Sequence, residues 1–283
     1  FPEKPLRAAI RDLTRTFPKR YTDGPLWLKT LDAKLTDGTA LRAEARRGNR
    51  EAFAALHALR RNLAELRRKA LLANPLLTFD RILFIRRGEK APRLGLPQNW
   101  MGNCGLPPRR YDDEIRLLNL QSPEAKPTTV FRPEDRKMVA DVDLEYDARR
   151  MLFSMRGTHG RWQIWEMAVD GTARRQVTHG THPDVDNYDA CYLPDGRIVF
   201  SSTRCFQGVP CVGGGQSVAN LFLMNSDGAD IRQLTFDQDH DWCPTVLNNG
   251  RVLYTRWEYT DTAHYFTRLL FHMNPDGSGQ MEY

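Results

Sequence analysis

Two cysteines could do chemistry in the loop of residues 201–217, whose sequence is SSTRCFQGVPCVGGGQS. Cys205 and Cys211 stand six positions apart between two stretches that read as β-strands. Such thiols can close a disulfide, or they can bind a metal ion together with imidazole and carboxylate groups. Covalent attachment of haem needs C-x-x-C-H, which the chain lacks. Any haem would therefore have to come from a segment outside this chain.

The side chains that could share a metal ion with these cysteines are His182, His240 and Asp186. A zinc-like ion suits this mixture of ligands, although no H-x-x-x-H or C-x-x-C spacing specifies one. For the isolated chain we favour a Cys205–Cys211 disulfide, because no ligand spacing argues for a metal, and both alternatives remain open. Asp186 also has a structural alternative, since an aspartate at the start of a repeat can cap neighbouring loops.

The elements that must position these residues repeat along the chain beyond residue 80. Arg followed by three apolar or aromatic residues recurs as RILF, RMLF, RIVF and RVLY, starting at residues 81, 150, 197 and 251. A strand-like stretch ending in Asp-Gly recurs from residues 164, 221 and 270. The Asp-Gly pair and the RQVT or RQLT phrase after it share one offset, since 227 − 170 and 232 − 175 both equal 57. Short strands repeated at this period without helices are typical of propeller blades.

The chain is therefore predicted to be mainly β, a β-propeller of at least four blades that start near residues 81, 138, 184 and 239. Because the sequence stops just after a third-strand turn, we expect a part of a larger propeller, with a four-bladed ring as the alternative.

The propeller fold predicts where the chemistry-bearing residues lie. In a blade, the loop from the second to the third strand shares a face with the links between blades. That face receives Cys205, Cys211 and five of the seven histidines, at positions 159, 179, 182, 240 and 264. Since sites are usually built on loops held by a rigid scaffold, we expect the functional site on this face, with the loop of Cys205 ordered near the channel mouth.

Residues 1–78 are predicted to form a basic helical region in front of the blades of residues 79–283. Residues 1–80 hold 17 Lys and Arg against 9 Asp and Glu, a net charge of 17 − 9 = +8, whereas the whole chain carries +6. Apolar periodicity predicts a helix over 51–74, capped by Asn49 or Gly48, and shorter helices over 6–14 and 40–47. Nucleic-acid binding is not expected, because the basic residues lie on helical faces without an aromatic stacking pattern. No apolar run reaches the roughly 18 residues of a membrane span.

Four stretches resemble the middle, propeller domain of the hydrazine synthase alpha subunit family: LPQNWMGNCG, SSTRCFQGVPCVGGG, NLFLMNSDGADIRQLT and TRWEYTD. The RQLT and PDGR phrases are also shared with TolB-type propellers. The resemblance implies a bacterial, periplasmic or otherwise extracytoplasmic protein, in a family that carries c-type haems and makes hydrazine from nitric oxide and ammonium in a multisubunit complex. This chain departs from the family in lacking C-x-x-C-H. The resemblance carries over only Cys205, Cys211 and the adjacent loop, as a candidate metal or haem-proximal site.

Three functions follow from these observations. The chain could be the scaffold or binding domain of a redox-complex subunit, in which case the resemblance implies an oxidoreductase. It could be a non-catalytic TolB-like protein-interaction propeller. It could also accompany a hydrolase domain, although it contains no G-x-S-x-G. In each case we expect protein partners or further domains of the same polypeptide, and whether the chain is an enzyme stays open.

Overall fold

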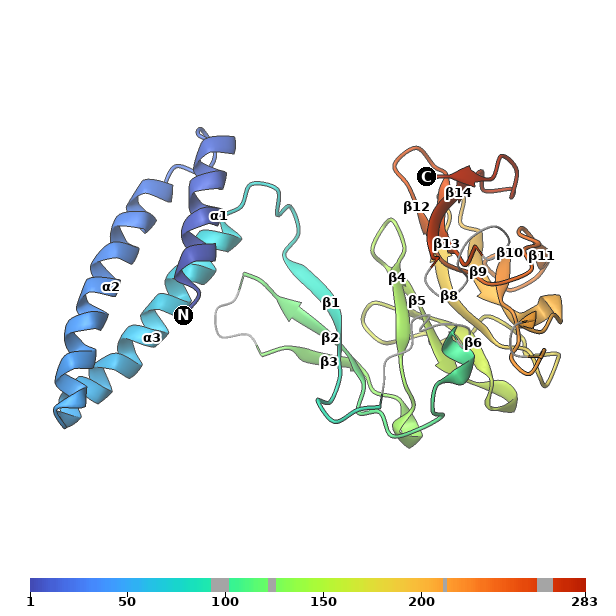
Figure 1. Ribbon diagram of the computed structural model, residues 1–283, viewed down its shortest axis with the longest axis horizontal. Coiled ribbons are helices and arrows are strands. Elements are labelled where there is room, and N and C mark those ends of the chain that lie inside the picture. The colour runs from blue at the N-terminus through green and yellow to red at the C-terminus, as the bar shows by residue number, and fades with distance from the viewer. Residues whose placement is uncertain (93–101, 122–125, 211–212, 259–266) are drawn as a thin grey trace. The chain divides into compact units, whose positions relative to one another are not determined.

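The computed structural model describes residues 1–92, 102–121, 126–210, 213–258 and 267–283 (Figure 1). The chain divides into two compact units, one of Phe1–Ile82 with Leu118–Pro127 and one of Leu83–Leu117 with Thr128–Tyr283. The predicted domain boundary after residue 78 stays a prediction. Within the described ranges, none of the helices has the length and apolar character needed to cross a membrane.

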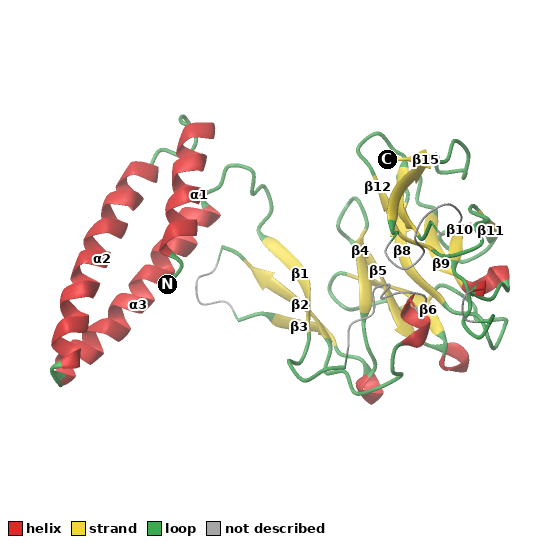
Figure 2. Ribbon diagram, viewed as in Figure 1, coloured by secondary structure: helices red, strands yellow, loops and turns green. Residues whose placement is uncertain are grey.

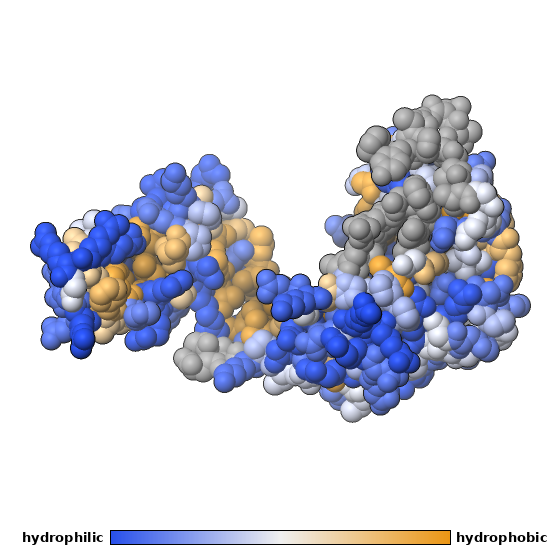
Figure 3. All heavy atoms as spheres, turned by 60° about the horizontal axis from the view of Figure 1, so that its bottom comes forward, coloured by the Kyte–Doolittle hydropathy of each residue, from blue (hydrophilic) through white to orange (hydrophobic). Residues whose placement is uncertain are grey.

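The first unit contains three helices, α1 (Glu3–Thr16), α2 (Gly24–Arg46) and α3 (Arg50–Leu72), drawn in red in Figure 2. Their apolar faces meet in a core of Leu6, Ile10, Tyr21, Leu31, Leu63, Leu66 and Ala70. Hydrophilic side chains line the outer edges of the helices, with hydrophobic ones between them (Figure 3). The predicted cap of α3 is confirmed, because the Asn49 side chain accepts hydrogen bonds from Glu51 N at 2.9 Å and Ala52 N at 3.3 Å.

Helix α2 is much longer than the helix predicted over residues 40–47. The sequence Thr36-Asp37-Gly38 reads as a turn, because Asp and Gly favour turns. In the structure Gly38 lies inside α2, and a Cβ added there would meet Leu59 Cδ2 of α3 at 3.0 Å. The glycine therefore serves close packing between two helices and does not end the first of them.

The second unit contains most of the strands, which form one three-stranded and three four-stranded antiparallel sheets among the described residues. Blade 1 is β1 (Arg81–Arg86), β2 (Glu114–Asn119) and β3 (Thr128–Phe131). Blade 2 is β4 (Ala140–Leu144), β5 (Arg150–Arg156), β6 (Trp162–Ala168) and β7 (Arg175–Gln176). Blade 3 is β8 (Asn187–Tyr192), β9 (Ile198–Ser202), β10 (Asn220–Met224) and β11 (Arg232–Gln233). Blade 4 is β12 (Asp241–Val246), β13 (Val252–Arg256), β14 (Leu269–Met273) and β15 (Met281–Glu282). The predicted fold class, a β-propeller with helices in front, is confirmed.

The repeated phrases fall at equivalent positions in blades 2, 3 and 4. RMLF, RIVF and RVLY lie on β5, β9 and β13, the second strand of each blade, and the Asp-Gly turns follow the third strand. RILF lies on β1, which is the first strand of its sheet, so among the described residues blade 1 has no counterpart of β4, β8 and β12. We call the end with the second-to-third strand loops and the blade links the loop face, and the opposite end the turn face.

The inner strands β4, β8 and β12 each contain a bulge at the same position. The pairing register shifts between Ala140 and Asp143, and it shifts likewise in the other two strands. The bulge places three equivalent residues in the left-handed region: Asp141 (φ 52°), Asp189 (φ 57°) and Cys243 (φ 54°). Because a bulge bends its strand and re-aims a side chain, Asp189 can reach the next blade, where its carboxylate accepts a hydrogen bond from Cys243 N at 2.7 Å.

Apolar side chains fill the space between neighbouring blades. Leu152 and Ile164 of blade 2 belong to one buried cluster with Phe200 and Phe222 of blade 3, whose rings lie 6.0 Å apart. A second cluster joins blades 3 and 4, and a third joins blades 1 and 2. Burying each large apolar side chain is worth about 1.5–3 kcal/mol, so inter-blade packing supplies a rigid frame for the loops.

Candidate functional site

The loop predicted to connect the second and third strands of blade 3 does so, since β9 precedes it and β10 follows it as antiparallel neighbours. It begins with a short 3-10 turn, Thr203–Cys205, capped by Ser202 Oγ, which accepts a hydrogen bond from Arg204 N at 3.1 Å. Its two sides then pair, with Val209 N donating to Gln216 O at 2.8 Å and Val218 N donating to Gln207 O at 2.9 Å. In its described part the loop is ordered, as predicted.

Glycine is required where this loop folds back on itself. A Cβ added to Gly208 would lie 2.6 Å from Gly214 Cα, closer than real Cβ contacts allow. The close approach of two backbone segments explains why glycines gather here. Residues 211 and 212 lie outside the described residues, so the structure says nothing of Cys211.

The loop contacts both histidine-bearing links, which confirms that it lies on the predicted face. The His182 ring, in the link before β8, meets the Phe206 ring edge-on at 5.6 Å. At the other end of the loop, Ala219 N donates to His240 Nδ1 at 3.0 Å. The loop face therefore joins His182, His240 and the loop of Cys205 in one region of blades 3 and 4.

Asp186 and His240 perform the same backbone task in successive blades. Asp186 Oδ1 accepts from Trp162 N at 2.8 Å, and Trp162 begins the third strand of the preceding blade. His240 Nδ1 accepts from Ala219 N, which directly precedes the third strand of its preceding blade. Asp186 also pairs with Arg161 at 3.2 Å. The structural alternative for Asp186, capping of a neighbouring loop, is confirmed, and a histidine takes over that role one blade later.

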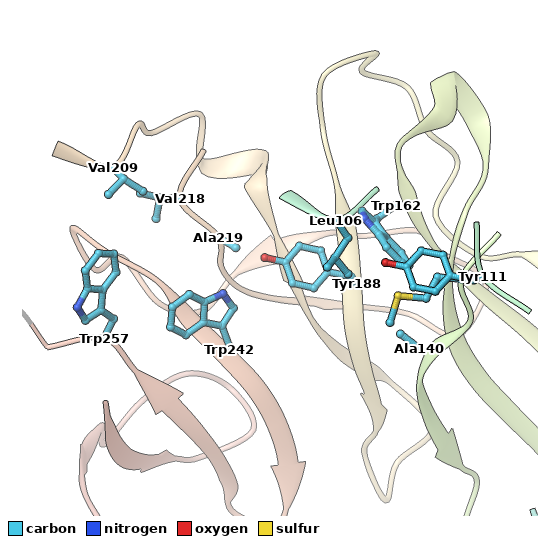
Figure 4. Close-up of a cluster of buried hydrophobic side chains, with 11 residues drawn as sticks. Leu106, Tyr111, Ala140, Trp162, Tyr188, Val209, Val218, Ala219, Trp242 and Trp257 are labelled. Carbon is cyan, nitrogen blue, oxygen red and sulfur yellow. The ribbon is translucent and has the colours of Figure 1, made fainter. Parts of the chain in front are cut away.

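His240 lies deep in an aromatic cluster. Its ring is buried and stacks on Trp242 at 4.4 Å and on Trp257 at 6.0 Å. Figure 4 shows these two tryptophans beneath Val209, Val218 and Ala219 of the loop. Since Nδ1 accepts a hydrogen bond from a backbone amide, the imidazole is held in the form that carries its proton on Nε2.

The disulfide that we favoured for Cys205 and Cys211 is wrong. Cys205 is a free thiol, and its Sγ donates a hydrogen bond to Val218 O at 3.3 Å. The sulfur is thus directed at the returning side of its own loop. Burial raises the pKa of the Cys205 thiol, so it is protonated near neutral pH and behaves as a packing side chain.

The predicted metal ligands occupy different environments. His182 is exposed, His240 is buried between tryptophans, and the Asp186 carboxylate is already hydrogen-bonded. Within the described parts of the chain, no group of three or more His, Cys, Asp and Glu side chains could hold a metal ion. Because Cys211 lies outside them, the metal site stays a prediction.

Sequence reasoning missed two neighbours of Cys205. Phe206 is 61% exposed and has left-handed backbone angles, φ 54° and ψ 36°. Arg204 is partly buried, and its Nε has no hydrogen-bond partner. No sequence signal announces either feature, because Phe is an uncommon residue in left-handed geometry and the lack of a partner is a three-dimensional property.

Sequence reasoning also missed a pair of carboxyl groups, Asp141 and Asp189, where the bulges of blades 2 and 3 meet. Asp141 accepts from Asn103 Nδ2 at 2.9 Å, and Asp189 N donates to Ser154 Oγ at 2.9 Å. Burial, followed by the charge of Asp141, raises the pKa of Asp189 to about 8. Burial also raises the pKa of Asp141, so this buried pair favours protonated carboxyl groups.

No protein-family model matches the chain, and no curated protein matches it. Among solved structures, it is similar to Kuenenia stuttgartiensis hydrazine synthase, with 15% identity and a TM-score of 0.53 over 72% of this chain and 31% of that one. It is also similar to a protein of Agrobacterium tumefaciens assigned as TolB, with 18% identity and a TM-score of 0.45 over 60% of this chain and 56% of that one. TolB from Acinetobacter baumannii gives 15% identity and a TM-score of 0.45 over 60% of this chain and 37% of that one.

This chain thus spans less than two thirds of the length of each of these relatives. At such identities the likeness to hydrazine synthase shows a shared propeller fold and nothing finer. Membership of the hydrazine synthase family stays a prediction.

Proposed function

We propose that the chain is a non-catalytic binding propeller whose protein partner docks on the loop face. The observation that carries this proposal is Phe206, an aromatic side chain that an ordered loop holds out to solvent in left-handed geometry. Left-handed backbone costs an L-residue about 1–2 kcal/mol. Strain of this kind concentrates at ligand clamps and active sites, and exposed aromatic side chains are frequent anchors of protein interfaces.

The described thiols support binding over covalent catalysis. Burial raises the pKa of Cys104, Cys205 and Cys243, so these sulfurs are protonated near neutral pH. A nucleophilic cysteine needs the opposite, a lowered pKa beside a cation or a base. The inter-blade packing instead favours a fixed scaffold that presents loops. An extracytoplasmic location and membership of a redox complex are also part of this proposal, and they are supported by the sequence resemblance alone.

The test uses the full chain as bait in extract of the native host, followed by purification of the captured protein and measurement of its Kd. We expect Phe206→Gly to weaken binding by at least about tenfold, the effect of losing one interface anchor. Tyr146→Ala is the matched control, since Tyr146 is an aromatic residue of similar exposure (63%) in the turn between β4 and β5, on the turn face. Equal binding by wild type and Phe206→Gly, or equal losses in both variants, would refute the proposal.

A further inference from the structure

Arg204 is a cation without a counter-ion in the described structure. Its guanidinium makes no hydrogen bond or ion pair there, and its Nε is buried without an acceptor. Burial is the single cause that lowers the pKa of Arg204, with no carboxylate acting in the opposite direction. A partly buried charge with no partner is costly, so an acceptor from outside the chain would relieve that cost.

Two other arginines at the same end of the blades, Arg161 and Arg256, are paired with carboxylates. Arg161 pairs with Asp186 at 3.2 Å and also donates to Pro183 O at 3.0 Å. Arg256 pairs with Asp237 at 2.9 Å and with Asp241 at 3.0 Å. Because Arg161 and Arg256 find carboxylates within the protein, the lack of one at Arg204 is not a general property of the arginines on this face.

The backbone of Arg204 is fixed on both sides. Thr203 N donates to Asp186 O at 3.0 Å, and Asp186 N donates to Thr203 Oγ1 at 2.9 Å, which ties the loop to the blade link. Ser202 caps the turn before Arg204, and Phe206 ends it in left-handed geometry. The Arg204 side chain therefore extends from a fixed backbone, which reduces the ordering cost of binding.

We propose that Arg204 binds a carboxylate of an acidic segment in the partner protein, while an apolar side chain of the same segment packs on Phe206. The guanidinium fork matches a carboxylate through two parallel N–H···O bonds. The single positive charge of Arg204 matches the single negative charge of a carboxylate. A doubly charged phosphate would be matched less well, because Asp184 and Asp186 on the adjoining link add negative charge nearby. This inference rests on the proposed function and assigns the chemistry of the partner at that face.

The experiment follows the Nε–H signal of Arg204 and the backbone amides of the loop by NMR, on the full chain labelled with ¹⁵N. The probes are N-acetylphenylalanine, which carries a carboxylate and an aromatic group, its uncharged amide, and inorganic phosphate. We expect N-acetylphenylalanine to shift the signals of Arg204 and of Phe206, and to bind at least about tenfold more tightly than its amide. Arg204→Met, which keeps the aliphatic stem, should abolish that preference. Arg197→Met, a loss of an arginine paired with Asp195 on the turn face, should not change it.

Several results would overturn the inference: equal binding of acid and amide, tighter binding of phosphate, or a carboxylate preference that survives Arg204→Met. Binding of the variants to the partner captured in the preceding test distinguishes a failure of this inference from a failure of the proposed function. If Phe206→Gly weakens partner binding and Arg204→Met does not, the loop face binds a partner but the carboxylate assignment fails. If neither variant affects partner binding, the proposed function itself fails.

Discussion

Polar groups are hydrogen-bonded in different ways on the turn face and on the loop face of the propeller. On the turn face the same device recurs, in which an Asp or Asn side-chain oxygen accepts from the backbone amide two residues later. This holds for Asp147, Asp170, Asp195, Asp227, Asn249 and Asp276, with distances of 2.9–3.1 Å. Each turn satisfies itself locally.

On the loop face the described loops differ in sequence, and within the described residues several buried polar atoms have no hydrogen-bond partner. Such atoms lie at the loop-face ends of strands or in the loops: Arg156 Nε, Trp162 Nε1, Arg204 Nε, Asp239 Oδ1 and Trp242 Nε1. Buried polar groups in proteins nearly always have hydrogen-bond partners. Buried polar atoms without partners on the loop face therefore indicate that this face has a different role from the turn face. Repetition on the turn face serves the fold, whereas the unsatisfied groups of the loop face are those that the proposed binding function would use.

The largest expected effect tests whether the turn face is structural. Gly228 has φ +89°, and an added Cβ would lie 2.1 Å from Val177 O, whereas Gly250, with φ +80°, has nothing within 4 Å. We expect Gly228→Ala to lower the free energy of unfolding by about 3 kcal/mol, from the left-handed backbone and the clash together. Gly250→Ala should cost about 1 kcal/mol, from the backbone alone. Denaturant unfolding measures both, and equal losses would contradict the prediction.

A second prediction concerns the layer between the faces, where Asp189 has a pKa raised to about 8. The raised value means that the folded state holds this proton more tightly than the unfolded state, in which Asp titrates near about 4. Stability from Asp189 is therefore full below about pH 4 and falls as the pH rises to about 8, by a few kcal/mol in total.

Asp189→Asn keeps an acceptor for Cys243 N but does not titrate. We expect its unfolding free energy to fall less than that of wild type between pH 5 and 9, as measured by denaturant titration at each pH. Asp195→Asn, at an exposed turn where a hydrogen bond with Arg197 lowers the pKa, is the control. A wild-type pH dependence retained in Asp189→Asn would show that another group is responsible.

The smallest expected effect concerns two residues with left-handed backbone, one on each face. Phe206 on the loop face and Ala148 on the turn face, with φ 54° and 56°, both hold left-handed backbone without being glycine. Replacing either by Gly should raise the free energy of unfolding by up to about 1 kcal/mol. Only Phe206→Gly should also reduce partner binding. A loss of stability in Phe206→Gly would mean that the contact of Phe206 with the His182 ring outweighs the cost of its left-handed backbone.

The sequence predicted what repeats and missed what does not. The phrases RMLF, RIVF and RVLY located the second strands, and strand alternation placed the loop of Cys205 on the face of His182 and His240. Such features are set by local patterns along the chain.

What the sequence could not provide depends on neighbours distant in the chain. Gly38 reads as a turn until Leu59 of another helix packs against it. His240 reads as a metal ligand until Ala219 N and two tryptophans surround it. Arg204 reads as an ordinary surface residue until its lack of a counter-ion is visible. For Gly38 and His240 a deciding contact, with Leu59 and with Ala219, lies 21 residues away in the chain, and for Arg204 it is missing among the described residues, so no local rule reports it.

The capping of one blade by the next has a consequence for how the chain folds as it is synthesised. Asp186, the acceptor for Trp162 N, is synthesised 24 residues after it. His240, the acceptor for Ala219 N, is synthesised 21 residues after it. Because chains emerge at about 5–20 residues per second, each blade would spend one to several seconds on the ribosome with an open amide at its third strand. Folding would thus advance with a lag of one blade behind translation, and a stall just after β6 or β10 would leave the exposed strand without its cap.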